Sequence, residues 1–267
     1  MAKEKKRVQD NHVELGTVVP LIQPYVLMID PSNICNHRCK FCPTGNSELI
    51  KATKRTQTLM DYDLYKKIIN DIREFDEPIR VLRLYKEGEP LLNKKFPDMV
   101  SYAKDSGFVH RVDTTTNGIC LNNNLNRKIV SAGLDQINIS VNGVNSEQVD
   151  FYTRTQINFD QYVANIRDLY EHKGDTEIYI KEIKDNLSEE EQEKFLEIFD
   201  PICDRIFLER LSPAWPSFLF DSSIPMKYEA GNYGQEVLER SICPYIFYIM
   251  VINSDGKASY CVGDWKH

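Results

Sequence analysis

Strand-like segments recur along most of this chain with room for a helix after each, and this alternation limits the folds open to it. Six segments rich in β-branched or aromatic residues are expected to be strands, with helices filling the gaps. Such alternation is typical of βα units around a parallel sheet. The expected strands cover residues 25–30, 79–85, 110–115, 136–141, 177–183 and 205–210.

Two of the expected helices have recognisable starts. Ser188 and Glu191 have the spacing of a capping box, in which each side chain bonds the backbone N–H of the other residue. Asn158 and Gln161 offer a similar start to an earlier helix.

The fourth expected strand has one apolar and one polar face. Ile137, Ile139 and Val141 share the first face, and Asn138, Ser140 and Asn142 share the second. The apolar face of a helix-covered parallel sheet packs on the helices, whereas a closed barrel fills its interior with Val, Ile and Leu. The polar face therefore predicts an α/β fold with an open, partial (β/α)6 barrel that holds a polar ligand. An edge strand wetted by solvent is the alternative.

Composition excludes several classes of protein. The 267 residues carry a net charge of −7, which does not favour nucleic acid as a partner. The longest mainly apolar run, residues 242–252, is far shorter than the ~20 residues of a membrane-spanning helix. The basic N-terminal tip leads into no apolar signal core, so a cytoplasmic location with reduced thiols is expected.

Three of the seven cysteines are clustered. Cys35, Cys39 and Cys42 have the spacing C-x3-C-x2-C, directly after the first expected strand. With His37 as a fourth ligand they would form a zinc site, and a zinc-stabilised binding module without catalysis is one hypothesis. Alternatively, three thiolates bind three irons of a four-iron cluster and leave one iron open for chemistry. The carboxyl end of a barrel strand is where active sites assemble, which favours the cluster.

The cysteine segment, with Phe41 before its last cysteine, resembles the signature of the radical S-adenosylmethionine (radical SAM) superfamily. The resemblance implies a [4Fe–4S] cluster whose open iron binds S-adenosylmethionine (SAM). An electron from a donor such as flavodoxin or ferredoxin would cleave SAM to a 5′-deoxyadenosyl radical that abstracts hydrogen from the substrate.

Further short motifs extend this resemblance and imply SAM contacts. Gly88-Glu89-Pro90 is similar to the GGEP segment of the family, whose glutamate binds the methionine amino group, although Lys86 or Glu87 replaces the first glycine. The TNG-like turn, the S-x-N-G segment and an arginine for the methionine carboxylate follow in chain order. The implied contacts are Phe41, Gly88, Glu89, Pro90, Asn117, Ser140, Asn142 and Arg154.

The C-terminal part resembles the opening of a SPASM or twitch extension. Cys243 and Cys261 enclose Gly256 as C-x12-G-x4-C, with Asp255-Gly256 predicting a hairpin turn between residues 245–253 and 257–261. The resemblance implies an auxiliary iron–sulfur cluster ligated by these two cysteines; buried structural thiols are the alternative. No later cysteine follows, so the extension is expected to be incomplete. The predicted division is a polar tail (1–20), the barrel (21–211) and the extension (212–267), which starts with an irregular connection.

The substrate is the least constrained part of the prediction. Too few residues precede the first strand for a leader-binding domain, so a small polyhydroxylated substrate, a carbohydrate or aminocyclitol that is oxidised or epimerised, is favoured over a peptide or protein. Polar residues at the strand ends are the candidate substrate contacts. They are Lys86, Glu87, Asn142, Lys181, Glu182 and Glu209.

Overall fold

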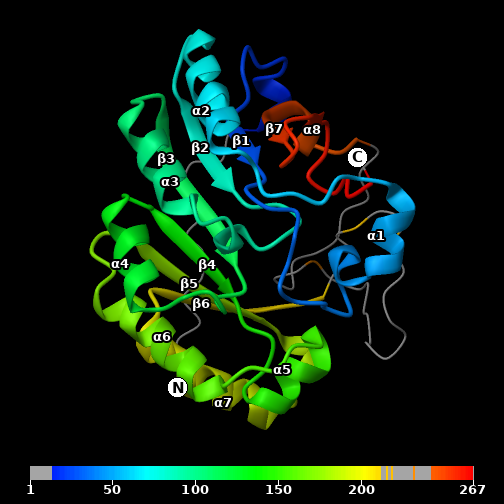
Figure 1. Ribbon diagram of the computed structural model, residues 1–267, viewed down its shortest axis with the longest axis vertical. Helices are drawn as coiled ribbons and strands as arrows, with labels where there is room; N and C mark the ends of the chain where they lie inside the picture. The colour runs from blue at the N-terminus through cyan, green and yellow to red at the C-terminus, as the bar shows by residue number, and fades with distance from the viewer. Residues whose placement is uncertain (1–13, 212–214, 216–217, 219–230, 232–241, 267) are drawn as a thin grey trace.

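The computed structural model describes residues 14–211, 215, 218, 231 and 242–266. Most of the predicted tail, and almost all of the predicted connection at 212–241, lie outside these residues. One eight-stranded sheet has the order β6-β5-β4-β3-β2-β1-β7-β8 (Figure 1). The strands are β1 (Val26–Ile29), β2 (Ile79–Leu84), β3 (Val109–Thr116), β4 (Gln136–Ser140), β5 (Glu177–Ile183), β6 (Arg205–Glu209), β7 (Ile249–Ile252) and β8 (Ala258–Ser259).

Strands β1 to β6 confirm the predicted partial barrel. Each pairs in parallel with the next along the chain, as in the register Val26↔Val81 between β1 and β2. The α-helices are α1 (Ser47–Thr53), α2 (Tyr62–Asp71), α3 (Phe96–Asp105), α4 (Asn123–Ser131), α5 (Ser146–Thr153), α6 (Phe159–Glu171), α7 (Glu189–Phe199) and α8 (Tyr245–Tyr248). Short 3-10 helices lie at Leu15–Thr17, Pro43–Gly45, Ile72–Glu74, Pro90–Leu92, Lys184–Asn186 and Asp200–Ile202.

The two predicted helix starts are present. Ser188 and Glu191 form the capping box of α7, since the Ser188 hydroxyl accepts from the Glu191 N–H and the Glu191 carboxylate accepts from the Ser188 N–H. The Asn158 side chain accepts from the Gln161 N–H at the start of α6. No helix among the described residues is long and apolar enough to cross a membrane.

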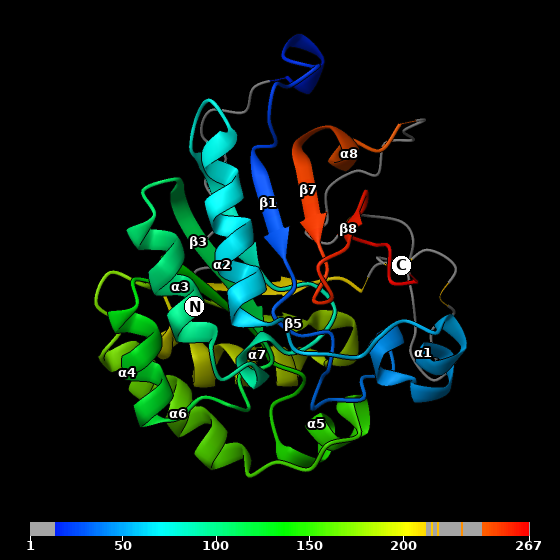
Figure 2. The same ribbon diagram turned by 45° about the horizontal axis from the view of Figure 1, so that its top comes forward.

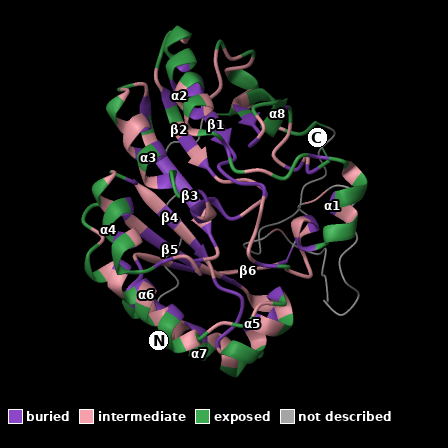
Figure 3. Ribbon diagram, in the orientation of Figure 1, coloured by how far each residue is buried: buried purple, intermediate pink, exposed green. Residues whose placement is uncertain are grey.

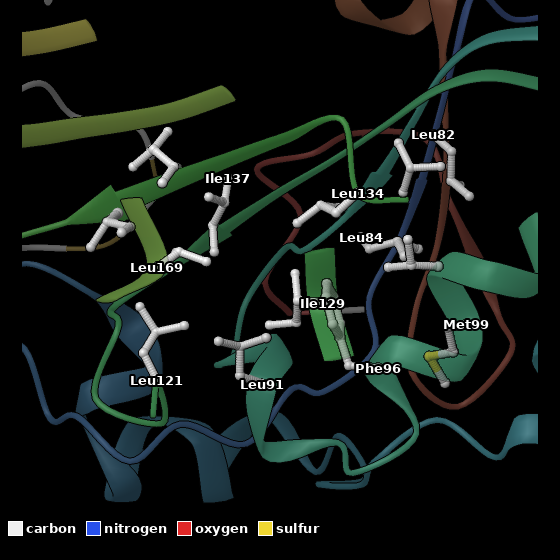
Figure 4. Close-up of a cluster of buried hydrophobic side chains, with 14 of the residues drawn as sticks. Leu82, Leu84, Leu91, Phe96, Met99, Leu121, Ile129, Leu134, Ile137 and Leu169 are labelled. Atoms are coloured by element: carbon white, nitrogen blue, oxygen red, sulfur yellow. The ribbon is translucent and has the colours of Figure 1, made fainter. Parts of the chain in front are cut away.

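The core lies between the sheet and the helices that cover its outer face. Side chains from β2, β4, α3 and α4 interlock there, and Figure 4 shows Leu82, Ile129 and Ile137 among them. Ile137 and Ile139 are fully buried while Asn138 and Ser140 on the opposite face are partly exposed (Figure 3), so the predicted two-faced strand is confirmed. Burying each large aliphatic side chain stabilises the fold by about 1.5–3 kcal/mol.

The C-terminal hairpin is confirmed, but its place in the sheet was not predicted. Strands β7 and β8 are antiparallel around a turn in which Gly256 has a φ of +86°. β7 also pairs in parallel with β1, in the register Val26↔Ile249, so the hairpin extends the barrel sheet (Figure 2). The strand starts later than expected because residues 245–248 form the short helix α8.

Candidate active site

The loop that follows β1 carries the three clustered cysteines. Its backbone is fastened to the end of α5, because the Arg38 N–H donates to the Thr153 carbonyl (2.8 Å) and the Lys40 N–H donates to the Tyr152 carbonyl (3.0 Å). The loop approaches itself closely at Gly45, where an added Cβ would lie 2.3 Å from the Cys39 carbonyl oxygen. Only glycine therefore fits at this position.

Burial dominates the chemistry of the three thiols. It raises the pKa of Cys35 to about 12, and it also raises the pKa values of Cys39 and Cys42. The thiols are therefore neutral in the metal-free protein, and metal binding must release their protons. Arg154, a predicted SAM contact, directly follows Thr153 and so lies close to this loop, and its charge lowers the pKa of Cys39 against the larger effect of burial.

His37 lies next to Cys39, with its Nδ1 at 3.8 Å from the cysteine Sγ. Burial lowers the pKa of His37 to about 4, so the ring is neutral. Among the residues that the structure describes, however, no three His, Cys, Asp or Glu side chains converge closely enough to hold a single metal ion.

The three thiols fit a four-iron cluster better than a single ion. Each thiolate of such a cluster binds a different iron, so the sulfurs need not converge on one point. All three are half-buried on one short loop, and the Asn117 side-chain amide lies 3.8 Å from the Cys35 sulfur. Cys35, Cys39 and Cys42 would hold the cluster, and no fourth cysteine of this loop competes for the remaining iron.

Glu89 is buried beside the cysteine loop, on the segment after β2. Its carboxylate accepts from the Thr116 hydroxyl (2.6 Å), the Asn117 N–H (2.8 Å) and the Leu91 N–H (3.0 Å). All three donors are neutral, and burial raises the pKa of Glu89 to about 7. A carboxylate that is held in place without a described cation partner is suited to bind the ammonium group of a ligand.

Gly88 and Asn117 join this segment to its neighbours. The Glu89 N–H donates to the Ile34 carbonyl (2.9 Å), and a Cβ added to Gly88 would lie 2.1 Å from the Ser32 carbonyl oxygen. Gly88 therefore allows the segment to pack directly on the cysteine loop, with Pro90 buried behind it. The Asn117 side chain donates to the Asn36 side chain (2.7 Å), which links the turn after β3 to the same loop.

A cavity of about 150 Å³ lies at the ends of β4 and β5. Its lining includes the predicted SAM contacts Phe41, Ser140 and Asn142 and the predicted substrate contacts Lys181, Glu182 and Glu209. Glu182 accepts from the Gly143 N–H (2.6 Å) and the Ile183 N–H (2.8 Å), and burial raises its pKa to about 8. Glu182 thus holds the turn that follows Ser140, whose Gly143 has a φ of +142°.

Lys86 and Glu87 do not lie with the other predicted substrate contacts. Their side chains are 1% and 0% exposed, and they pair with each other at 2.9 Å. Glu87 also pairs with Arg55, a residue that the sequence did not single out. Side chains enclosed in these ion pairs do not face a ligand. The predicted substrate role of Lys86 and Glu87 is therefore wrong.

A second cavity, of about 160 Å³, lies on the concave face of the sheet and is polar, as the sequence predicted. Its charges are paired, because Lys181 Nζ lies 3.2 Å from Glu209 Oε2 and Arg83 Nε lies 3.7 Å from Asp113 Oδ2. Its full lining is Arg83, Tyr85, Asp113, Thr115, Gln136, Asn138, Tyr179, Lys181, Phe207 and Glu209.

The two C-terminal cysteines lie on either side of the hairpin. Cys243 is exposed, just before α8, and Cys261 is half-buried, two residues after β8. Because β8 runs antiparallel to β7, the chain after β8 returns toward the start of β7, the side on which Cys243 lies. The Cys261 sulfur accepts from the Gly263 N–H (3.3 Å).

Three half-buried cysteines lie on the loop after the first strand of a partial parallel barrel, an arrangement suited to hold an iron–sulfur cluster at the carboxyl ends of the strands. Residues 29–192, more than half of the chain, match the family model described as the radical SAM superfamily. The chain belongs to this superfamily, whose members use a [4Fe–4S] cluster and SAM.

Individual relatives are more distant. The chain is 33% identical over 128 residues to a probable GTP 3′,8-cyclase of Methanococcus maripaludis, covering 48% of this chain but only 39% of that protein. It is similar in fold to Streptococcus suis SuiB bound to S-adenosylmethionine (TM-score 0.69, 16% identity, 92% of this chain and 62% of that one). BtrN in complex with AdoMet and 2-DOIA has a TM-score of 0.51, with 15% identity over 90% of this chain and 74% of that one.

Proposed function

We propose that this protein is a radical SAM enzyme that abstracts a hydrogen atom from a small polyhydroxylated substrate, a carbohydrate or an aminocyclitol, and thereby oxidises or epimerises it. When bound and reduced by a donor such as flavodoxin or ferredoxin, the cluster and SAM supply a 5′-deoxyadenosyl radical for this abstraction. Glu89 is proposed to bind the methionine ammonium group, and Arg154 its carboxylate.

The composition of the cavity on the concave face carries the proposal for the substrate. Its two acids each have a cation beside them, so the cavity offers little net charge to an anionic ligand. Thr115, Gln136 and Asn138 supply hydroxyl and amide groups that both donate and accept hydrogen bonds. Tyr85, Tyr179 and Phe207 add aromatic surface for the apolar C–H faces of a ring. A molecule rich in hydroxyl groups matches this lining.

The two cavities share residues, which supports a short path between SAM and substrate. Lys181 and Glu209 line both the cavity on the concave face and the one that contains Ser140 and Asn142. A nucleoside near Ser140 would therefore lie next to a substrate near Asn138. Hydrogen abstraction needs such proximity, because the reacting atoms must be held about 3–3.5 Å apart.

The extension supports placement in the SPASM/twitch subgroup. Cys243, the hairpin and Cys261 follow one another as that resemblance requires, and we propose that the two cysteines contribute to an auxiliary iron–sulfur cluster. Such a cluster would accept an electron from a substrate radical, which favours oxidation over epimerisation. Iron bound beyond four atoms per chain, and lost in Cys261→Ala, would support it; four irons in both proteins would contradict it.

Deuterium transfer tests the substrate class. Carbohydrates and aminocyclitols with deuterium on ring carbons are incubated with the reconstituted, reduced protein, and the expected result is deuterium in 5′-deoxyadenosine. Asn138→Leu, in the cavity, should abolish the transfer, whereas Asn124→Leu, exposed on α4, should not. Deuterium transfer from peptides alone would replace this proposal with a peptide-modifying activity.

A further inference from the structure

The outer surface of the cysteine loop and α1 is basic, in contrast to the chain as a whole. Residues 35–56 contain five Lys and Arg residues and one acid, Glu48, whereas the chain has a net charge of −7. One of the five, Arg55, is buried in an ion pair. The other four reach the surface, where three are exposed and one is half-buried. The exposed ones are Arg38, Lys51 and Lys54, and the half-buried one is Lys40.

An exposed aromatic side chain lies among these cations. Phe151 of α5 is 50% exposed, and the Lys40 Nζ lies 3.3 Å from the centroid of its ring. The backbone hydrogen bonds from Arg38 and Lys40 to the end of α5 hold the loop beside this ring. Figures 1 and 2 both show α1, which carries Lys51, on the same side of the molecule as α5. We call Arg38, Lys40, Lys51, Lys54 and Phe151 the basic surface.

The basic surface has the composition of a protein interface. Aromatic and arginine side chains are enriched at protein–protein contacts, where an apolar anchor lies within a polar rim. Its positive charge selects a partner of the opposite sign, because complementary charges speed encounter and suppress wrong partners. Arg38 and Lys40 stand on either side of Cys39, so a partner that binds them lies next to a proposed cluster ligand.

We propose that the basic surface is the docking site of the acidic protein that delivers an electron to the cluster. The donor loses one electron and the cluster gains it, and no bond is formed or broken. Docking beside Cys39 keeps the distance for this transfer short. A surface of few residues is sufficient, since electron-transfer complexes have small interfaces. The inference rests on the proposed function, because the cluster is what requires the donor.

Equilibrium binding tests the docking directly. A flavodoxin and a ferredoxin, each of acidic pI, are titrated separately into the reconstituted protein at about 0.05 M and about 0.5 M NaCl, which differ strongly in screening. At the lower salt concentration, Arg38→Gln/Lys40→Gln should bind the donor about tenfold more weakly than the parent protein. At the higher salt concentration this difference should shrink. Phe151→Ala should weaken binding at both concentrations, because salt does not screen an apolar contact.

Arg73→Gln/Lys128→Gln is the matched control, with the same change in net charge. Both residues are exposed, Arg73 just after α2 and Lys128 in the last turn of α4. The helices of a parallel sheet run back toward the amino ends of the strands, so both cations lie at the opposite end of the barrel from the cysteine loop. The control should bind each donor like the parent protein.

The rate of cluster reduction is the second readout, followed by rapid-freeze electron paramagnetic resonance (EPR). After anaerobic mixing with the reduced donor, the cluster of Arg38→Gln/Lys40→Gln should be reduced about tenfold more slowly than that of the parent protein. Reduced methyl viologen is a small cation that needs no docking surface. It should reduce the cluster of this variant at least as fast as that of the parent protein.

Three results would overturn the inference and leave the proposed function in place. They are equal donor affinities of the parent protein and Arg38→Gln/Lys40→Gln, equal slowing of this variant with both kinds of reductant, and a parent protein that holds a cluster but binds neither donor. A parent protein that forms no cluster would instead overturn the proposed function, and the docking inference with it.

Discussion

Glu87 and Glu89 lie two residues apart, and both are buried, but their surroundings differ. Glu87 is enclosed by Arg55 and Lys86, so its charge is compensated within the fold. Glu89 accepts from a hydroxyl and two backbone N–H groups, all neutral, and its pKa is raised to about 7. Glu87 therefore joins segments together, whereas Glu89 keeps a negative charge that a cationic ligand can satisfy.

The largest effect is expected from removing the charge of Glu87, which pairs with both Arg55 and Lys86. Glu87→Gln leaves two buried cations without their shared counter-charge, and removing one partner of a buried pair costs about 3–5 kcal/mol of unfolding free energy. Urea denaturation of the metal-free protein measures this. Glu177→Gln is the matched control, because Glu177 pairs with Arg111 at a position where its side chain is 38% exposed. Such a pair is worth about 0–1 kcal/mol. Equal losses in the two variants would contradict the comparison.

The second-largest effect is expected at Glu89, the buried carboxylate that has no cation partner among the described residues. Glu89→Gln keeps the shape and acceptor oxygen but removes the charge, so SAM should bind about 10- to 100-fold more weakly, the range for losing a charge-assisted hydrogen bond. The unfolding free energy should fall by about 1–3 kcal/mol, less than in Glu87→Gln, since the amide nitrogen that replaces one carboxylate oxygen leaves a buried donor without its acceptor. Equilibrium binding of SAM to the reconstituted protein measures the change. Glu147→Gln, exposed in the first turn of α5, should bind SAM like the parent.

The raised pKa of Glu89 predicts that both the affinity for SAM and the free energy of unfolding depend on pH. Because burial raises this pKa from 4.5 to about 7, the folded protein holds the proton more tightly than the unfolded chain, and the contribution of Glu89 to stability falls as pH rises between those values. SAM needs the ionised form, so its affinity should fall about tenfold per pH unit below pH ~7. Glu89→Gln should remove this dependence. An equal slope in parent and variant would assign the titration to another group.

The smallest effect tests how the hairpin docks. An alanine at Gly256 must adopt a φ of +86°, which costs about 1 kcal/mol, and its Cβ would lie 3.0 Å from Leu64 of α2. Gly107→Ala imposes a similar φ of +72° with nothing within 4 Å of the added atom. Thermal unfolding should show a greater loss for Gly256→Ala. Equal losses of stability in the two variants would mean that Leu64 of α2 moves to make room for the added Cβ.

Much of the fold and part of the site follow from local sequence. The six barrel strands, the two-faced β4 and the hairpin at Asp255-Gly256 depend on alternation and turn chemistry that short segments contain. Glu89 could be predicted because it stands in a short motif directly after a strand. Arg55 could not be predicted, since its contact with Trp265 joins residues 210 positions apart and neither belongs to a motif.

The position of β7 was missed for a related reason. Alternation shows that a segment is a strand but not which neighbour it pairs with, and the free edge of β1 accepts β7 in parallel register. The same long-range packing buried Lys86 and Glu87, which local sequence placed among the substrate contacts. Residues whose role depends on which segments meet are the ones that sequence patterns identify least well.

The central claim is that three thiolates hold a cluster with one iron left open for SAM. EPR of the anaerobically reconstituted and reduced protein, recorded before and after SAM is added, tests it most directly. We expect the signal of a reduced [4Fe–4S] cluster that changes shape when SAM binds, with both lost in Cys39→Ala and kept in Cys203→Ala. A protein that binds only zinc, or a cluster signal that SAM leaves unchanged, would contradict the account.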